Sequence, residues 1–445
     1  MISSWRRRRA TRRARKEQLV GCEEAGETEL TIPSHFRCPI SLDLMKDPVT
    51  LSTGITYDRE SIETWIDAGN RTCPITNQAL RSLEPIPNHA IRRMVQDWCV
   101  ENRSFGIERI PTPRIPASPM DVLEILKNIA SASERGDRDG CIESVAKMKA
   151  LVREGERNKR CFATHGAGTA LSSAFEEFSN TSSLDENIIV LFEEMLSVFP
   201  SMFPLNSEAR SHLGSPASLH CMILLLKSGD LTARRNSVLV LKEIVSSDSR
   251  NKAEEVAEID GAPEALYKLI KEPICPTATK AALVVIYRMT SLNPTNEKII
   301  TRLVEMGLVN LLIETLVDAD RSVCEKALGV LDGICNIELG RVTTYDHSLT
   351  VAALVKKLLR VSELATEFSV SVLWKLARRN DQPDDGALVE ALQVGAFQKL
   401  LLLLQVGCGE RTKEKATELL KLLNLHRERS ECIDSSDFKD LKRPF

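Results

Sequence analysis

The segment Ala327-Leu-Gly-Val-Leu recurs, with small changes, along the C-terminal two thirds of this 445-residue chain. The similar segments are Ser237-Val-Leu-Val-Leu, Ala282-Leu-Val-Val-Ile, Ser371-Val-Leu-Trp-Lys and Ala416-Thr-Glu-Leu-Leu. Their first residue is small each time, and the successive spacings are 45, 45, 44 and 45 residues. A fixed period of this length indicates stacked repeats, because no single repeat can bury its own apolar face.

A second marker runs in step with the first. The triplets Asp260-Gly261-Ala262, Met306-Gly307-Leu308 and Val394-Gly395-Ala396 each precede an apolar stretch with helical spacing. We interpret the glycine as a turn that starts one long helix, followed by a polar loop and a second helix. The small residue then lies where the second helix approaches its neighbour. The pattern predicts a right-handed α-solenoid, and a period near 45 with three helices per unit is similar to armadillo repeats.

The repeat domain is predicted to span residues 120–428. Between 120 and 230 the helical pattern continues but its phase is looser, so we interpret this part as degenerate or capping repeats. A polar tail follows at residues 429–445. Before the repeats, residues 106–119 contain four prolines and no helical pattern, which predicts a stiff linker.

The N-terminal segment, residues 1–30, is predicted to be a basic disordered arm. Its first 16 residues hold eight of the 59 Lys and Arg residues and no Asp or Glu. Such a run repels itself and has no apolar periodicity. It is a candidate nuclear-localisation signal or a peripheral contact with anionic lipid. The alternative is a solvated tail that no specific partner recognises.

Composition excludes several classes of protein. Beyond residue 16, 51 basic and 62 acidic residues give a net charge of −11, which argues against nucleic acid as the main partner. No stretch approaches the roughly 20 apolar residues of a membrane span, and arginines occupy the place of a signal-peptide core. The twelve cysteines include no C-x-x-C pair, which favours buried thiols in a reducing compartment. We therefore expect a cytoplasmic protein, with the nucleus or a membrane surface as further locations.

Residues 31–105 form a compact segment in which strand-like and helical patterns are mixed. Its two similar stretches are Cys38-Pro39-Ile40-Ser41-Leu42 and Cys73-Pro74-Ile75-Thr76-Asn77. Cysteines next to prolines suggest the loops of a zinc-bound RING, but a two-site zinc module needs about eight ligands. The segment holds only five His and Cys residues, so we predict no metal and no cofactor. The loops must then be cross-braced by hydrogen bonds, salt bridges and apolar packing.

Between the two stretches, residues 48–51 and 54–57 are predicted to pair as a small hairpin. Asp58 is predicted to cap a following helix that carries Ile62, Trp65 and Ile66 on one face. A second helix follows Asn88. Its predicted apolar residues are Ile91, Met94, Val95 and Trp98.

In this order of elements, the segment resembles the U-box, the metal-free relative of the RING found in ubiquitin ligases. A U-box, a linker and armadillo repeats together resemble the plant U-box/armadillo ligases. The resemblance implies a ligase without its own catalytic residues. Such a module binds a ubiquitin-conjugating enzyme that carries ubiquitin as a thioester, and holds the ubiquitin in a reactive pose for a substrate lysine.

By the same resemblance, five residues are expected to contact the conjugating enzyme: Ile40, Leu42, Trp65, Pro74 and Ile75. The alternative is that these residues form the core of the module. We assign Ile62, Tyr57 and Val49 to that core.

Two positions depart from related proteins. Strongly activating RING and U-box members carry an arginine that bridges ubiquitin and its carrier, where this chain has Asn77. Asparagine lacks the charged planar fork of arginine, so activation is expected to be weaker or selective. Armadillo proteins that bind nuclear-import signals use Trp followed four residues later by Asn, but here Trp374 is followed by Arg378. Cargo import is therefore disfavoured.

Three functions compete. The leading one is a ubiquitin-protein ligase whose repeats bind a substrate or regulator, with a homodimer as an open possibility. The family resemblance adds plant stress and immune signalling. The second is a non-catalytic armadillo scaffold with an inactive U-box. The third, a catalytic-cysteine ligase or hydrolase, has no supporting nucleophile–base pattern. The cysteines on helical patterns are instead expected in the core: Cys141, Cys221, Cys324 and Cys335.

Overall fold

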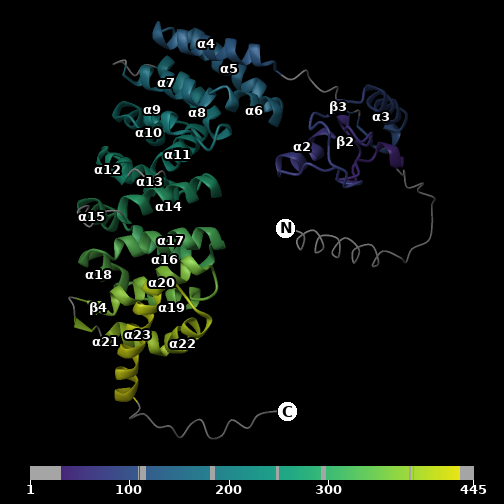
Figure 1. Ribbon diagram of the computed structural model, residues 1–445. Helices are drawn as coiled ribbons and strands as arrows, with labels where there is room; N and C mark the ends of the chain where they lie inside the picture. Colours follow the sequence, from purple (N-terminus) through teal and green to yellow (C-terminus); the bar gives the residue numbers. More distant parts are fainter. Residues whose placement is uncertain are drawn as a thin grey trace, which may run out of the picture. The chain divides into compact units, whose positions relative to one another are not determined.

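The computed structural model describes residues 32–108, 110, 117–180, 186–246, 250–291, 297–379, 382–383 and 385–430. The predicted basic arm, most of the predicted polar tail and residues 111–116 of the predicted linker lie outside these ranges. The chain divides into two compact units, Met1–Ile115 and Pro116–Phe445. Figure 1 shows the helices and strands of each unit.

The first unit is a small mixed module. Its antiparallel sheet has the strand order β2-β1-β3, with Val49 paired to Tyr57 on one side and to Pro87 on the other. The predicted hairpin is therefore confirmed. The elements are η1 (Ser34–Phe36), β1 (Pro48–Thr50), β2 (Thr56–Asp58), α2 (Arg59–Asp67), β3 (Ile86–Pro87), α3 (His89–Glu101) and η2 (Arg103–Phe105).

Two small apolar clusters fill this unit. The first contains Val49, Tyr57 and Ile62, all fully buried, as predicted for the core. The second lies against α3, where Val95 and Cys99 pack with Phe36 and Ile110. Met94, another apolar residue of α3, is half exposed.

Both ends of the predicted linker belong to the folded units. Ile110 is buried against α3, and its carbonyl accepts a hydrogen bond from the side-chain amide of Gln96 at 3.4 Å. At the other end, the Ala117 N–H donates to Asn158 Oδ1 at 2.9 Å, and Ser118 caps the first helix of the second unit. The predicted linker, residues 106–119, therefore includes residues that contact the folded units.

The second unit is a stack of helices (Figure 1). This confirms a mostly α fold in which a helical solenoid follows a small mixed module along the sequence. It begins with the pair α4 (Pro119–Glu134) and α5 (Arg138–Glu154). The next two repeats are α6 (Glu156–Thr164), α7 (Ala167–Asn180), α8 (Glu186–Val198) with η3 (Phe199–Ser201), and α9 (Ser207–Leu213), α10 (Pro216–Ser228), α11 (Leu231–Ser246).

Four further three-helix repeats complete the stack. The first two are α12 (Arg250–Glu258), α13 (Ala262–Lys271), α14 (Pro276–Ser291), and α15 (Glu297–Glu305), α16 (Leu308–Asp318), α17 (Arg321–Ile334). The next is α18 (Glu338–Asp346), α19 (Thr350–Lys357), α20 (Glu363–Leu376), followed by the short strands β4 (Arg378–Arg379) and β5 (Gln382–Pro383). The last is α21 (Asp385–Gln393), α22 (Ala396–Val406), α23 (Glu410–Ser430).

Residues 156–246 form two full three-helix repeats, so the region interpreted as degenerate keeps the repeat architecture. Gly166 precedes α7 with a φ of 79°, close to the values of 79°, 84° and 83° at Gly261, Gly307 and Gly395. Such a positive φ is the conformation that glycine adopts without steric cost. Gly166 was thus a sequence signal for this region that the spacing analysis left out.

The small residue that marks each repeat is the seventh residue of the third helix. Counted in this way, Ser237, Ala282, Ala327 and Ala416 are correct, and all four are fully buried. In α20 the seventh residue is Ser369, also fully buried, and not Ser371 as the spacing predicted. The third helices begin at 231, 276, 321, 363 and 410, so α20 starts 42 residues after α17, and α23 starts 47 residues after α20 with the β4–β5 insertion between them.

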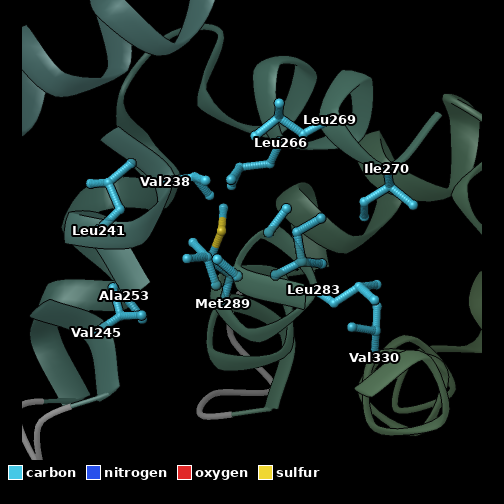
Figure 2. Packing of buried hydrophobic residues seen from close by; sticks show 14 of the residues in the cluster. Val238, Leu241, Val245, Ala253, Leu266, Leu269, Ile270, Leu283, Met289 and Val330 are labelled. Atoms are coloured by element: carbon cyan, nitrogen blue, oxygen red, sulfur yellow. The ribbon is translucent and has the colours of Figure 1, made fainter. Parts of the chain in front are cut away.

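Third helices of neighbouring repeats approach each other closely. α14 and α17 are so near each other that a Cβ added at Gly333 would lie 2.9 Å from the Cβ of Thr290. Figure 2 shows the packing around Met289, where side chains from α11, α13 and α14 point toward one another, among them Val238, Leu266 and Leu283. These contacts continue from repeat to repeat and make one long apolar core.

Within the described residues, no single helix is long and apolar enough to cross a membrane. One bent pair of helices, 386–393 with 396–406, meets that test by length and composition when taken together.

Candidate functional site

Two short loops of the first unit share a sequence pattern and a backbone conformation. The first loop is residues 38–42 and the second is residues 73–77. In each, the N–H of the fifth residue donates to the carbonyl of the cysteine at 2.8 or 2.9 Å, and the cysteine N–H donates to the residue after the loop at 2.9 Å. The fifth residue has a left-handed backbone in both, with φ of 63° at Leu42 and 55° at Asn77.

Strand β2 joins the two loops. The Tyr57 hydroxyl lies 3.1 Å from Cys73 Sγ in the second loop. The N–H of the next residue, Asp58, donates to Cys38 Sγ in the first loop at 3.3 Å. In a zinc module, cysteines in such loops bind metal. Here both sulfurs take part in hydrogen bonds with neighbouring residues of one strand, so hydrogen bonds cross-brace the loops.

The Tyr57 hydroxyl and the Cys73 thiol each have a shifted pKa. Burial and the contact with Cys73 raise the pKa of Tyr57 well above its usual range. Burial alone would raise the pKa of Cys73, but the side chains of Thr53, Thr76 and Tyr57 lower it to about 6. The contact between the Tyr57 hydroxyl and the Cys73 sulfur thus shifts the pKa of both groups, in opposite directions.

A polar cluster between the first loop, α2 and α3 was not found by sequence reasoning. Asp58 Oδ1 accepts hydrogen bonds from the N–H groups of Lys46 at 2.8 Å and Asp47 at 2.9 Å. The expectation that the side chain of Asp58 caps α2 was therefore wrong, although the residue does precede the helix. The carboxylate of Asp47 in turn binds Arg59 Nε at 2.6 Å and the guanidinium of Arg92.

The five residues expected to contact a partner fall into two groups. Leu42 in the first loop and Ile75 in the second are 56% and 53% exposed. Ile40, Trp65 and Pro74 are half-buried, and Ile40 and Trp65 pack partly against the first apolar cluster. The last three therefore contribute to the folded module and to its surface.

The indole of Trp65 fixes the second loop to α2. Its Nε1–H donates to the carbonyl of Thr72 at 2.8 Å, and the Trp65 carbonyl accepts from the side-chain amide of Asn70 at 2.9 Å. The exposed side chain of Ile75 thus projects from a loop that is already held in place before any partner arrives.

Asn77 is exposed at the end of the second loop, where its place matches that of Leu42 in the first. Asparagine adopts the left-handed backbone more readily than most residues with a side chain. The left-handed backbone at this position therefore explains by itself why the residue is an asparagine, and no contact with a partner is needed for that explanation.

The four cysteines assigned to the solenoid core are buried, as predicted. Burial raises the pKa of Cys141 and Cys221 to about 12 and that of Cys335 to about 11. Cys324 is buried beside the carbonyl of Ala319 at 3.3 Å. Protonated thiols inside a helical core do not serve as nucleophiles. No group of His, Cys, Asp or Glu in the described ranges is arranged to hold a metal.

In the second unit, Trp374 is the centre of a polar cluster on the third helices. Its ring lies 5.1 Å from the guanidinium of Arg378 and 5.4 Å from the amine of Lys415. Its Nε1–H donates to Glu418 at 2.7 Å. Contacts from α20 to α23 therefore hold the only tryptophan of the repeats in a half-buried position with charges on its faces.

The chain matches two family models. The model described as "U-box domain" matches residues 32–104, and "Plant U-box protein ARM repeat region" matches residues 121–443. Among curated relatives, "U-box domain-containing protein 21" of Arabidopsis thaliana is 47% identical over 95% of this chain and 95% of its own length. The Arabidopsis "E3 ubiquitin-protein ligase PUB23" is 34% identical over 89% of this chain and 93% of its own.

Solved structures also resemble the second unit. "Designed armadillo repeat protein YIII(Dq)4CqI" has a TM-score of 0.44 and 20% identity, over 56% of this chain and 98% of its own.

Proposed function

The chain belongs to the plant U-box proteins with an ARM repeat region, and we propose that it acts as a ubiquitin-protein ligase. Relatives named as E3 ubiquitin-protein ligases support this activity at the level of the family. In our proposal the U-box binds a conjugating enzyme that carries ubiquitin. The repeats hold the protein that receives the ubiquitin, or a regulator.

The reaction that we propose proceeds without a covalent intermediate on this chain. The amine of a substrate lysine attacks the thioester carbonyl between ubiquitin and the conjugating enzyme. An isopeptide bond forms, and the thiolate of the conjugating enzyme leaves. The U-box contributes by restricting the motion of ubiquitin near the lysine, which lowers the entropic part of the barrier.

One observation carries the proposal: each of the two matching loops exposes a large apolar side chain, Leu42 in one and Ile75 in the other. An exposed apolar patch on a soluble protein marks an interaction site. Both loops are braced by β2 and by Trp65, so little ordering entropy is lost when a partner binds. The half-buried Ile40 and Pro74 would support the same contact from beneath.

The third helices around Trp374 are our candidate for the substrate or regulator surface. A tryptophan within a cluster of charged residues is a frequent hot spot of protein interfaces. The neighbouring ion pair between Lys375 and Asp332 at 2.7 Å links α20 back to α17. A partner that contacts Trp374 would therefore meet a surface shared by three repeats.

Reconstituted ubiquitination tests the ligase proposal. Purified chain is incubated with activating enzyme, a panel of conjugating enzymes, ubiquitin and ATP. We expect ubiquitin chains with the wild type, and their loss in Leu42→Ala and Ile75→Ala. These two positions are better than Ile40 and Trp65 for the test, because exposed residues can be changed without a large effect on folding.

The alternative is a scaffold whose U-box no longer activates ubiquitin transfer, and Asn77 is the observation that favours it. No product and no binding with any conjugating enzyme of a broad panel would support this alternative. Binding without product would assign the loss to the position of Asn77.

Three further expectations remain predictions. They are a role in plant stress or immune signalling, a cytoplasmic location with the nucleus or a membrane surface as alternatives, and peripheral lipid contact through the basic arm.

A further inference from the structure

Three neighbouring third helices contribute to the polar cluster around Trp374. The amine of Lys375 on α20 donates to Asp332 on α17, at 2.7 Å to the carboxylate and 2.6 Å to the backbone carbonyl. In the same way, the amine of Lys415 on α23 donates to the hydroxyl of Ser371 on α20 at 2.7 Å. Each lysine therefore reaches back to the third helix of the preceding repeat, but only Lys375 meets a carboxylate there.

The carboxylates of this cluster are already engaged. The one on α17 binds Lys375. The other, on Glu418, accepts from the indole N–H of Trp374 at 2.7 Å and lies 3.2 Å from the guanidinium of Arg378. The amine of Lys415 contacts a neutral hydroxyl and the face of the indole ring instead. Among the described residues, no carboxylate lies within ion-pair distance of this amine.

Positive charge is therefore in excess at the cluster. Three cations, Lys375, Arg378 and Lys415, stand against two carboxylates, and Arg411 is exposed on the same helix as Lys415. Burial lowers the pKa of Lys415. The negative charge of Asp332 raises this pKa, while the positive charges of Lys375 and Arg411 lower it. A half-buried amine without a counter-ion is stabilised when a carboxylate accepts a hydrogen bond from it.

We propose that this cluster binds an acidic segment of the protein that the repeats hold, and that a carboxylate of the segment accepts a hydrogen bond from Lys415. Such binding rests on the proposed role of the repeats as the surface for a substrate or regulator. The side chains of Trp374, Arg378 and Lys415 are half-buried, so part of each is open to a partner.

Charge distinguishes an acidic segment from other occupants. A basic segment would add to the excess of positive charge and meet like-charge repulsion. Nucleic acid carries the right sign of charge, but its affinity comes from many clustered basic residues. The chain beyond residue 16 has a net charge of −11, which repels a long polyanion and tolerates a short acidic segment at one site.

Glu418 gives the proposal a test in which binding improves. Its carboxylate holds the indole of Trp374, but its charge also repels an incoming carboxylate. Glu418→Gln keeps an oxygen that can accept from the indole N–H and removes the charge. An acidic segment should therefore bind this variant several-fold more tightly. Damage to the fold would weaken binding, so it cannot imitate this result.

Fluorescence anisotropy of labelled peptides tests the proposal with the full chain and without ubiquitin. The probe is the peptide Glu-Ser-Glu-Ser-Glu-Ser-Glu-Ser, and its control carries lysine in place of each glutamate. We expect the glutamate probe to bind, more weakly as salt rises, and at least about 10-fold more tightly than the lysine probe.

Two lysines of α23 provide matched variants. Lys415→Gln can still bond to Ser371 but loses the charge, and should weaken binding of the glutamate probe on the order of 10-fold. Lys413 is exposed and lies about 200° around the helix from Lys415. Lys413→Gln should therefore leave the affinity unchanged. Thermal unfolding of both variants checks that each is folded.

Three results would overturn the proposal. They are no binding of the glutamate probe up to about 1 mM, equal affinity of the wild type and Lys415→Gln, and no gain in Glu418→Gln. Tighter binding of a single-stranded DNA oligonucleotide than of the glutamate probe, lost in Lys415→Gln, would assign the cluster to nucleic acid instead.

Discharge of ubiquitin to free lysine by the wild type separates this proposal from the ligase proposal, because it needs no acceptor on the repeats. Accelerated discharge without peptide binding rejects the acidic-segment site and leaves the ligase activity standing. Peptide binding without accelerated discharge supports the site and rejects the ligase activity.

Discussion

In the U-box, the carboxylate of Asp47 and the hydroxyl of Tyr57 connect segments that are far apart in the sequence. In the repeats, Ala327 and its counterparts allow neighbouring helices to share an apolar core. The U-box has two small clusters and depends on a few polar contacts, each without a substitute. The solenoid spreads its stability over many similar contacts between neighbours. A destabilising substitution in the U-box should therefore unfold the whole module. A destabilising substitution in the repeats should affect only the neighbouring repeats.

The largest expected effect is in the repeats. Leu312→Ala removes a fully buried side chain from the interior of α16 and should cost about 3 kcal/mol. Hydrogen exchange should then show faster opening in α15–α17 and the adjoining repeats, while α3 of the U-box keeps its protection. Leu123→Ala, at an exposed position of α4, is the control and should have little effect. Equal loss of protection in α3 would mean that the two units do not unfold separately.

A smaller effect is expected for the polar cluster of the U-box. Asp47→Ala leaves the guanidinium groups of Arg59 and Arg92 half-buried without their carboxylate, and should cost about 2 kcal/mol. Unlike the repeat variant, it should expose the whole U-box to exchange and abolish ubiquitin transfer. Asp43→Ala, at an exposed position, should retain activity. Activity in Asp47→Ala would show that the bracing is redundant.

The stability of the U-box should also depend on pH in a way that the stability of the repeats does not. The U-box contains the thiol–phenol pair of Cys73 and Tyr57, and the described residues of the repeats contain no such pair. The pKa of Cys73 in the folded chain, about 6, is below its unfolded value of 9.0. A depressed pKa stabilises the fold fully above pH 9, and this contribution is lost as the pH falls toward 6. The free energy of unfolding of the U-box should therefore decrease over this interval.

Tyr57→Phe should weaken that dependence and cost about 1 kcal/mol, because it removes the hydrogen bond of Tyr57, one of the contacts that lower the pKa of Cys73. Denaturant unfolding of the full chain, monitored by exchange in β1 and α3, measures both effects. An unchanged slope against pH in Tyr57→Phe would contradict the role of Tyr57 in lowering the pKa of Cys73.

The smallest effect on stability is expected at Asn77. Asn77→Arg places an arginine in a left-handed backbone and should cost about 0.5 kcal/mol. If this position bridges ubiquitin and its carrier, the charged fork should raise the rate of ubiquitin transfer several-fold. Transfer rates with one conjugating enzyme at equal concentrations measure this change. A rate that stays the same or falls would remove the bridging role from this position.

Sequence patterns predicted the repeats well because each unit is specified by local features, such as Gly261 and Ala282, that recur at nearly constant spacing. The error at Ser371 arose because a nearly constant spacing hides one repeat of 42 residues, from α17 to α20, followed by one of 47 residues, from α20 to α23. Only the helix starts show that Ser369 is the true counterpart.

The U-box was harder to predict in detail. Its loops, hairpin and helices follow from local motifs, but the contacts of Asp47 with Arg59 and Arg92 join residues up to 45 positions apart. No periodicity signals such contacts. Ile110 was missed for a related reason, since prolines around it indicate a linker while its side chain is needed by the core at Cys99.

Single-turnover discharge of ubiquitin from a charged conjugating enzyme to free lysine tests the central claim most directly. The full chain is compared with the double variant Leu42→Asp and Ile75→Asp, and with Met94→Asp as a matched change at an exposed apolar residue of α3. We predict that the wild type and Met94→Asp accelerate discharge equally and that the double variant is at least about 10-fold slower. Equal rates for all three proteins would contradict the assignment of these two loops as the docking site.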